Sequence, residues 1–299
     1  MTTRCREFIA AEKQAGGNVA KACDLLEVSR SAFYEWHQHV PSARALSDAE
    51  LTEKIRAVHL ASRGTYGAPR VHAELAAQGL HVGRKRVARL MVAAGLGGRC
   101  RRRTRRTTFA DPEARALNLL ERAFGPENIV IDTAWAGDIT YARTWEGWAY
   151  LATVIDLASR KVVGWAMADH MESSLVCEAM RMALRDRRPG PGLMFHSDRG
   201  SQYTSHEFRQ LLEKHHITQS LSRPAQCWDN SVAEAWFGTY KLELIEGRSW
   251  RSIAELRAET LLWIEGWYNL RRRHSSIKYF SPVEYERQLS CNSTATEAA

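Results

Sequence analysis

The sequence predicts an α/β protein in which a mixed-sheet domain follows an all-α region with a helix-turn-helix pattern. Residues 1–110 read as helices and hold 20 basic against 9 acidic residues, whereas the rest of the 299-residue chain holds 22 basic and 25 acidic residues. A stretch dense in arginine and without acid, "GRCRRRTRRTT" (Gly98–Thr108), separates the two parts. After it, short runs of β-branched and aromatic residues alternate with amphipathic stretches, as in a layered α/β domain.

Residues 1–45 hold the first helix-turn-helix-like pattern. Apolar positions in "NVAKACDLL" are followed by a break and by Ser29, a residue type that commonly caps a helix, before "SAFYEW". Helix, short turn and capped helix is the arrangement of many DNA-reading modules. From this stretch alone, any pair of packed helices explains the pattern equally well.

Residues 46–98 form a second helical region. We expect a long helix over Asp48–Ser62, a helix with Pro69 in its first turn that runs to about Gln78, and a third helix over Arg84–Ala94. Four basic side chains lie along the third helix: Arg84, Lys85, Arg86 and Arg89. A solvated basic face is the plain alternative, but two helix pairs in one strongly basic segment favour DNA binding.

Residues 99–124 are expected to be a basic linker. Like charges at this density repel one another and do not pack into a core, so we expect the segment to lie along DNA phosphates. A localisation signal or a solvated linker is the alternative. The expected DNA contacts are Arg101, Arg102, Arg103, Arg105 and Arg106. Residues 1–106 together are expected to carry most of the affinity for DNA.

Residues 125–285 are expected to form the sheet domain with its C-terminal helices. "TAWAGDITYART" and "WAYLATVIDLASRKVVGWAMAD" read as three consecutive antiparallel strands, and "LMFHSD" and "ITQSLS" as two short ones. Long helices are expected over Asp229–Glu246 and Ser252–Asn269. The tail, residues 286–299, is expected to be disordered.

Three acids stand out by their positions in these elements. Asp138 lies in the middle of the first strand, Asp198 directly after a buried strand, and Glu234 in the helix after the last strand. Each has a structural alternative: a hydrogen-bonded strand acid, a turn former, and a capping box with Ser231. Carboxylates so placed can converge at one sheet edge, where Mg²⁺ would offset their repulsion. Two ions about 3.5–4 Å apart would clamp the oxygens of a phosphoryl displacement.

Longer stretches around these acids resemble a known family. "GDITYARTWEGWAYLATVIDLASRKVVGWAM", "HSDRGSQYTS" and "CWDNSVAEAWFGTYKLEL" are similar to the three catalytic blocks of integrase-core DDE transposases. Nearly the whole chain, including "YNLRRRHSSIKYFSPVEYE", resembles the second-frame (OrfB) proteins of the insertion-sequence three family of bacterial elements. The thirty-five residues between Asp198 and Glu234 match the family's spacing. The loop "RPAQCWDN" lacks a glycine expected before the third block.

The resemblance implies a ribonuclease-H-like fold in which Asp138, Asp198 and Glu234 bind Mg²⁺ or Mn²⁺. It implies a DDE-type transposase, a polynucleotidyl transferase that cleaves DNA at the ends of an insertion sequence and transfers the cut strand. A non-catalytic DNA-binding regulator or a decayed transposase is the alternative. Lys241 supplies the basic residue that the family has seven positions after its Glu. A run of three arginines is either a phosphate clamp or a solvated helix end: Arg271, Arg272 and Arg273.

Other residues near the acids have less specific readings. His196 either orients a ligand or packs within its strand, and Gln202 and Tyr203 are expected in a surface loop that could touch DNA. Asn230 is expected to cap a helix.

The resemblance also implies partners. These are the terminal inverted repeats and target DNA, further copies of the chain, and the first-frame (OrfA) protein, separate or fused by frameshift. The six scattered cysteines form no CxxC pair, which argues against a zinc site or a disulfide framework. No apolar run approaches the roughly 20 residues of a membrane helix. We therefore expect a soluble protein of the bacterial cytoplasm, associated with the nucleoid.

Overall fold

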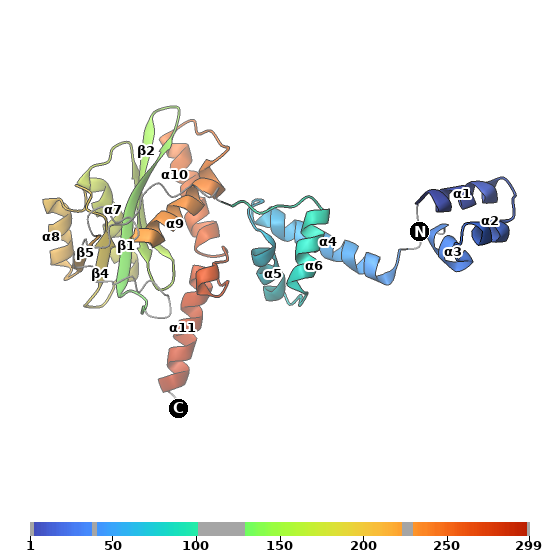
Figure 1. The fold of residues 1–299 in the computed structure, drawn as a ribbon. Coiled ribbons are helices and arrows are strands. Elements are labelled where there is room, and N and C mark those ends of the chain that lie inside the picture. Colours follow the sequence, from blue (N-terminus) through green and yellow to red (C-terminus); the bar gives the residue numbers. More distant parts are fainter. Residues whose placement is uncertain (1–2, 38–40, 101–128, 223–229, 298–299) are drawn as a thin grey trace, which may run out of the picture. The chain divides into compact units, whose positions relative to one another are not determined.

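The structure is a computed structural model that describes residues 3–37, 41–100, 129–222 and 230–297 (Figure 1). The chain divides into two compact units, Met1–Ala57 and Val58–Ala299. This division differs from the boundary expected after residue 45, because it falls inside α4 (Ala43–Ala61). Most of the second helical region therefore belongs to the same unit as the sheet.

The first unit is built around three short helices, α1 (Thr3–Gln14), α2 (Val19–Leu25) and α3 (Arg30–His37). The helices expected on either side of the turn at residues 26–29 are both present. Their apolar faces meet in a small core with these members: Ile9, Ala22, Cys23, Val28 and Phe33. None of the three helices has to be stable on its own, because helices this short are marginal in water and the shared core holds them together.

The second helical region agrees closely with expectation. Helix α4 begins earlier than expected because Ser42 caps it, its hydroxyl accepting the amide of Ala45 at 3.2 Å. Helix α5 (Ala68–Ala77) has Pro in its first turn, and α6 (Arg84–Ala93) follows. The buried residues of α6 are Val87, Leu90 and Met91, so its opposite side faces solvent.

A five-stranded mixed sheet forms the centre of the second unit (Figure 1). Its strand order is β3-β2-β1-β4-β5, with β1, β2 and β3 antiparallel and β4 and β5 parallel to β1. The strands are β1 (Ala134–Arg143), β2 (Trp148–Asp156), β3 (Val162–Ala168), β4 (Met194–Ser197) and β5 (Thr218–Leu221). The predicted fold class, an α/β domain with a mixed sheet after an all-α region, is confirmed.

Helices cover both faces of the sheet. On one face, α7 (Ser173–Arg187) and α8 (His206–Lys214) pack over residues such as Trp135 and Val154. On the other, α9 (Ser231–Tyr240) and α10 (Ile253–Leu261) pack over residues such as Leu151 and Ile155. Each of the two expected long helices changes from an α- to a π-helix, in η3 (Lys241–Ile245) and η4 (Leu262–Tyr268). Such wider turns are often found at functional sites.

Gly137 brings β1 into close contact with β4. A Cβ atom added at this position would collide with the ring of Phe195, which is fully buried beneath it. Glycine at position 137 therefore leaves room for the ring of Phe195, which projects from β4 over β1. β1 and the Phe195 ring are therefore closely packed at the residue directly before Asp138.

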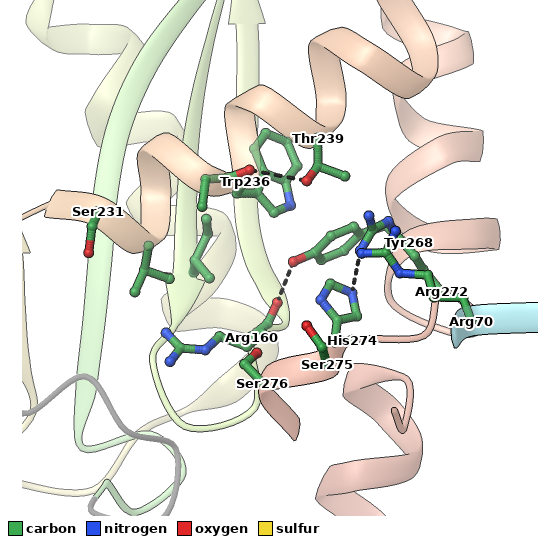
Figure 2. Close-up of a pocket in the computed structure, with 13 residues that line it drawn as sticks. Arg70, Arg160, Ser231, Trp236, Thr239, Tyr268, Arg272, His274, Ser275 and Ser276 are labelled. Atoms are coloured by element: carbon green, nitrogen blue, oxygen red, sulfur yellow. Dashed lines mark hydrogen bonds between the residues drawn. The ribbon is translucent and has the colours of Figure 1, made fainter. Parts of the chain in front are cut away.

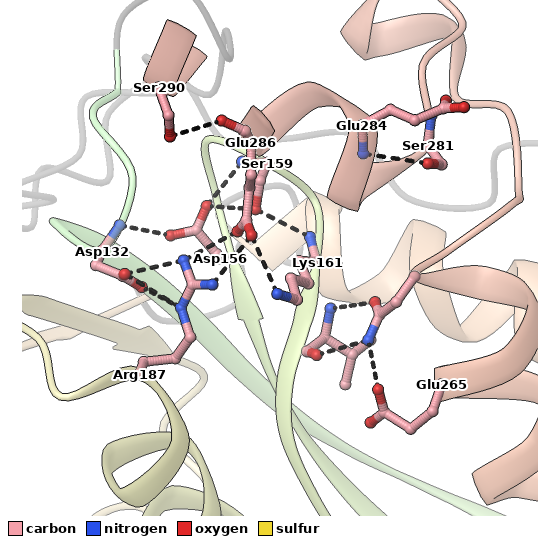
Figure 3. Close-up of polar contacts among 12 residues, drawn as sticks. Asp132, Asp156, Ser159, Lys161, Arg187, Glu265, Ser281, Glu284, Glu286 and Ser290 are labelled. Atoms are coloured by element: carbon pink, nitrogen blue, oxygen red, sulfur yellow. Dashed lines mark hydrogen bonds and ion pairs between the residues drawn. The ribbon is translucent and has the colours of Figure 1, made fainter. Parts of the chain in front are cut away.

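The C-terminal segment corrects the expectation of a disordered tail from residue 286. After η5 (Ser275–Ile277), helix α11 runs from Pro282 to Glu297. Glu286 anchors it to the sheet domain by ion pairs with Lys161 at 3.0 Å and Arg187 at 2.9 Å (Figure 3). With its first turns held in place, extending the helix adds one backbone hydrogen bond per residue, which is why composition alone misjudged it.

A buried carboxylate supports the same corner of the fold (Figure 3). Asp156 ends β2 and accepts hydrogen bonds from the amide of Asp132 at 2.8 Å and from the amide and hydroxyl of Ser159 at 2.7 and 2.8 Å. Arg187 of α7 then joins Asp132 to Glu286. The network therefore links β1, the β2–β3 turn, α7 and α11. Among the described residues, no helix is long and apolar enough to cross a membrane.

Candidate active site

Asp138 lies in the middle of β1, opposite Thr153 of β2. Its side chain is half-buried, and Oδ1 accepts a hydrogen bond from the amide of Ile139 at 2.8 Å. Its neighbours two and four residues along the strand, Thr140 and Ala142, are buried, and Ala142 belongs to the core beneath α9. Because side chains two apart share a face of a strand, Asp138 faces the side of the sheet that α9 covers.

Asp198 follows β4 directly. The parallel register pairs Ala136 with His196, so extending it by two residues would place Asp198 level with Asp138 on the neighbouring strand. Asp198 is exposed, and its Oδ1 accepts the amide of Gly200 at 2.9 Å. The turn-forming role considered from the sequence is therefore real, and it fixes the carboxylate at the edge of the sheet.

His196 packs inside the sheet. Its ring nitrogens lie 2.9 Å from the hydroxyl of Ser220 and 3.2 Å from that of Ser222. The side chain is fully buried. Of its two readings, the packed strand histidine fits these contacts, and its role is to hold β4 against β5.

Glu234 is exposed in the first turn of α9. The N-cap of this helix is Asn230, so Ser231 is one residue too late for the capping box considered with Glu234. Asn230 makes no side-chain cap bond and instead donates from Nδ2 to the carbonyl of Gly137 at 3.2 Å. This contact ties the start of the Glu234 helix to the residue before Asp138.

The electrostatics of Asp138 connect the three acids. Burial is the largest cause that raises the pKa of Asp138 to about 7, and the negative charges of Asp198 and Glu234 raise it further. The amide of Ile139 and the positive charge of Lys241 act in the opposite direction. The two other carboxylates are therefore near enough to Asp138 to make its charged form unfavourable. A cation between them would relieve this repulsion.

The donor set fits a hard divalent ion in its chemistry, since Mg²⁺ is bound through few carboxylates and keeps several waters. Across the described ranges, however, no three His, Cys, Asp or Glu side chains are gathered tightly enough to enclose a metal ion. Asp138 and Asp198 each bond a nearby backbone amide. Each bond uses only Oδ1, and a carboxylate keeps further lone pairs on both oxygens, so these bonds do not exclude an ion.

Tyr203 is buried and does not lie in the surface loop that the sequence predicted. It lies in the core between Phe195 and Phe208 and is 3% exposed, so it is not a surface residue that touches DNA. Burial raises the pKa of its hydroxyl, and the charges of Asp138 and Asp198 raise it further. Tyr203 is therefore buried close enough to both aspartates for their charges to act on it. No local sequence pattern distinguishes a buried tyrosine in a loop from an exposed one.

Lys241 begins η3, seven residues after Glu234. Its ammonium lies over the ring of Tyr141, 5.2 Å from the ring centre, and its charge is felt by Asp138. Arg99, directly after the second helical region, donates to the carbonyl of Leu242 at 3.1 Å. The ammonium of Lys241 thus contacts the exposed ring of Tyr141 and also acts electrostatically on Asp138.

The other expected DNA contacts fall into three groups. On α6, Arg84, Lys85 and Arg89 are exposed and Arg86 is half-buried. The five arginines expected in the linker lie outside the described residues: Arg101, Arg102, Arg103, Arg105 and Arg106. The third group consists of the three consecutive arginines that follow η4: Arg271, Arg272 and Arg273.

In this third group only Arg271 is exposed. Arg272 is 3% exposed and forms a two-pronged ion pair with Glu243, and Arg273 is 8% exposed and pairs with Glu74 and Glu284. The expectation that Arg272 and Arg273 act as a phosphate clamp is corrected, because carboxylates inside the protein already occupy both guanidinium groups. The sequence could not show this, since Glu74 and Glu243 are distant along the chain.

Comparison with protein families identifies the parts of the chain. Two models described as "Integrase core domain" match residues 132–227 and 215–282, and one described as "HTH-like domain" matches residues 46–104. The first covers Asp138 and Asp198, and the second covers Glu234.

Curated relatives are similar over most of their length. A "Putative transposase for insertion sequence element IS986/IS6110" of Mycobacterium tuberculosis is 40% identical over 268 residues, which is 87% of this chain and 95% of that protein. "Transposase InsF for insertion sequence IS3A" of Escherichia coli is 37% identical over 289 residues, 94% and 99% of the two chains. The "Insertion element IS600 uncharacterized 31 kDa protein" of Shigella sonnei is 38% identical over 267 residues, 89% and 97%.

Among solved structures, the integrase catalytic core domain of HTLV-2 in complex with magnesium is similar at 16% identity, with a TM-score of 0.39. The match covers 52% of this chain and 97% of that one.

Proposed function

The chain belongs to the family of bacterial insertion-sequence transposases of the IS3 type, and we propose that Asp138, Asp198 and Glu234 form its catalytic metal-binding centre. One observation carries the proposal. Asp138 lies at the centre of β1, level with Asp198 after the neighbouring strand. Besides burial, the charges of Asp198 and of Glu234 on the helix raise the pKa of Asp138. A non-catalytic regulator is not favoured, because all three acids are present and face one region.

Each residue would have a distinct part in this centre. Asp138 and Asp198, fixed on adjacent strands, and Glu234, held near them by Asn230, would hold Mg²⁺ or Mn²⁺. Divalent ions held there would activate water and stabilise the charge that develops on the phosphate. Lys241 would contact a phosphate of the DNA beside the centre, since about two helical turns separate it from Glu234 on the same side.

The reaction is a transfer of phosphodiester bonds in DNA. Water would attack the phosphodiester at the element end, and the bond to the 3′ oxygen would break to leave a free 3′-hydroxyl. The oxygen of that hydroxyl would then attack the phosphorus of a second phosphodiester. A new phosphorus–oxygen bond forms, the bond from this phosphorus to its original 3′ oxygen breaks, and that oxygen leaves as a new 3′-hydroxyl. The reaction would take place on DNA in the cytoplasm, at the nucleoid. Further copies of the chain and the first-frame protein are the partners we propose for assembly on the paired ends.

The exposed side of α6 is expected to bind DNA phosphates. Replacing Arg84, Lys85 and Arg89 by Gln in the full chain should weaken binding to element-end DNA and make the affinity less sensitive to salt. Each lost phosphate contact should lower the slope of log affinity against log salt by about 0.9. Fluorescence anisotropy with labelled duplex DNA over a range of sodium chloride concentrations measures both effects.

The matched control removes three exposed charges from the sheet domain instead, by replacing Arg185, Arg209 and Lys214 with Gln. This variant has the same net charge as the α6 variant. If both variants lose the same affinity and slope, the effect belongs to total charge and α6 is not the DNA-binding face.

Lys241 is expected to position DNA next to the acids. Because a hydrogen bond from a charged donor is worth about 1.5–3 kcal/mol, Lys241→Ala should slow strand transfer by about ten- to a hundred-fold. Binding of Mn²⁺, measured by calorimetry, should survive. Lys214→Ala removes an exposed lysine elsewhere and serves as the control. If Lys241→Ala cleaves and joins element ends at the unaltered rate at every salt concentration, Lys241 does not position DNA and only contacts Tyr141.

A further inference from the structure

A pocket of about 270 Å³ lies beside α9 (Figure 2). Val232, Trp236 and Thr239 of α9 line it, and with about 3.6 residues per turn they lie roughly opposite Glu234 on the helix. The remaining walls come from α5, the β2–β3 turn and the segment from Tyr268 to Ser276. The pocket is therefore separate from the candidate active site.

The walls of the pocket are rich in positive charge. They contain the guanidinium groups of Arg70, Arg160 and Arg272, and the described lining residues include no Asp or Glu. Arg272 is balanced from behind by Glu243 at 2.8 Å. Arg70 donates through Nε to the carbonyl oxygen of Arg273 at 3.0 Å, and none of the ion pairs between described residues involves it. A neutral carbonyl satisfies a hydrogen bond but leaves the positive charge of Arg70 in place.

The pKa of His274 shows that the charges of these cations act at one place. Burial is the main cause that lowers its pKa well below the ordinary value, and the charges of Arg272, Arg70 and Arg160 lower it further. Three guanidinium groups therefore act on one buried, neutral imidazole. Positive charges brought together in a partly desolvated place favour an anion between them.

The mouth of the pocket offers hydroxyl groups. Ser275 and Ser276 are exposed at the start of η5, and Ser231 of α9 is half-buried (Figure 2). Guanidinium and hydroxyl donors together are suited to phosphate oxygens, which Arg can bind with two parallel hydrogen bonds. A volume of about 270 Å³ is below the roughly 300–1,000 Å³ of pockets that enclose a drug-sized ligand. It is large enough for one phosphate group together with bound water.

We propose that this pocket binds a phosphate group, with Arg70 as its principal cation and Ser276 at its mouth. The group could be a backbone phosphate of bound DNA, away from the bond that reacts, or a free phosphate ion. Either would contact the helix that carries Glu234 from its other side. The site does not depend on the acids or on divalent ions.

The test is calorimetric titration of the full chain with inorganic phosphate, in EDTA and at constant ionic strength with chloride as the reference anion. Saturable binding is expected. Arg70→Gln and Ser276→Glu should each weaken it at least about ten-fold, and Arg70→Lys should weaken it less because it keeps the charge. Ser276 is exposed, so Ser276→Glu tests the pocket without removing a buried contact. Ser276→Gln controls for side-chain size and should weaken binding less than Ser276→Glu, because it adds no negative charge. Arg185→Gln controls for loss of a surface charge and should bind as the unaltered chain does.

The result that overturns the proposal is phosphate binding no stronger than chloride binding, or an equal affinity in Ser276→Glu and Ser276→Gln. Repeating the titration with the protein saturated by a short DNA duplex separates the two sources. If DNA prevents phosphate binding and Ser276→Glu also weakens DNA binding, the ligand is a DNA phosphate. If phosphate and DNA bind independently, the ligand is a free phosphate ion. Because EDTA removes divalent ions, failure of the proposed catalytic centre would leave these results unchanged.

Discussion

Asp198→Asn is expected to abolish cleavage and joining of insertion-sequence ends while the fold and DNA binding persist. The substitution keeps the size of the side chain and its ability to accept the amide of Gly200, but it removes one of three charges. A metal centre supplies several kcal/mol of transition-state stabilisation, and about 1.4 kcal/mol corresponds to ten-fold in rate. We therefore expect a loss of about a thousand-fold or more.

The measurement is cleavage of labelled element ends with Mg²⁺ or Mn²⁺, with and without the first-frame protein. Activity of the unaltered chain should vanish in EDTA and return when the ion is restored. Calorimetry should show weaker Mn²⁺ binding by Asp198→Asn. Asp186→Asn removes an aspartate on α7 that pairs with Arg185 on the surface, and it should retain full activity. Full nicking by Asp198→Asn would show that the three acids are not the catalytic centre.

The second large effect concerns stability. Glu243→Ala is expected to lower the free energy of unfolding by about 3–5 kcal/mol, because it leaves the buried guanidinium of Arg272 without its counter-charge. Glu243 lies in η3, two residues after Lys241, and Arg272 follows η4. The pair therefore fixes the end of the helix that carries Glu234 to the C-terminal segment. Urea denaturation followed by circular dichroism measures the change.

Two comparisons make this prediction specific. Asp186→Ala breaks an exposed ion pair and should change stability by no more than about 1 kcal/mol. The double variant Glu243→Leu/Arg272→Met removes both charges and should cost less than Glu243→Ala alone. If Glu243→Ala unfolds at the same urea concentration as the unaltered chain, the pair is not a support of the fold.

The sequence by itself determined the order of the elements and the positions of the acids within them. Periodicity placed five strands and the helices between them, because a strand or helix that packs on one core must repeat its apolar residues at its own period. The helix bounds were also close, since Ser, Pro and Gly act locally at helix ends, as Pro69 does in α5. The places of the acids could be predicted because strand centre, strand end and helix start are local properties; their role as a metal centre stays a prediction.

Only the tertiary structure decided which charges are free to meet a ligand. Arg272 and Arg273 look like neighbouring Arg271 in the sequence, yet Glu243, Glu74 and Glu284 bury two of the three. Asn230 was expected to cap a helix but bonds Gly137. Each of these outcomes depends on a partner far away in sequence, and a local pattern contains no information about a distant partner. Folding brings the partners together, and the cost of leaving a charge buried alone decides which pairs form.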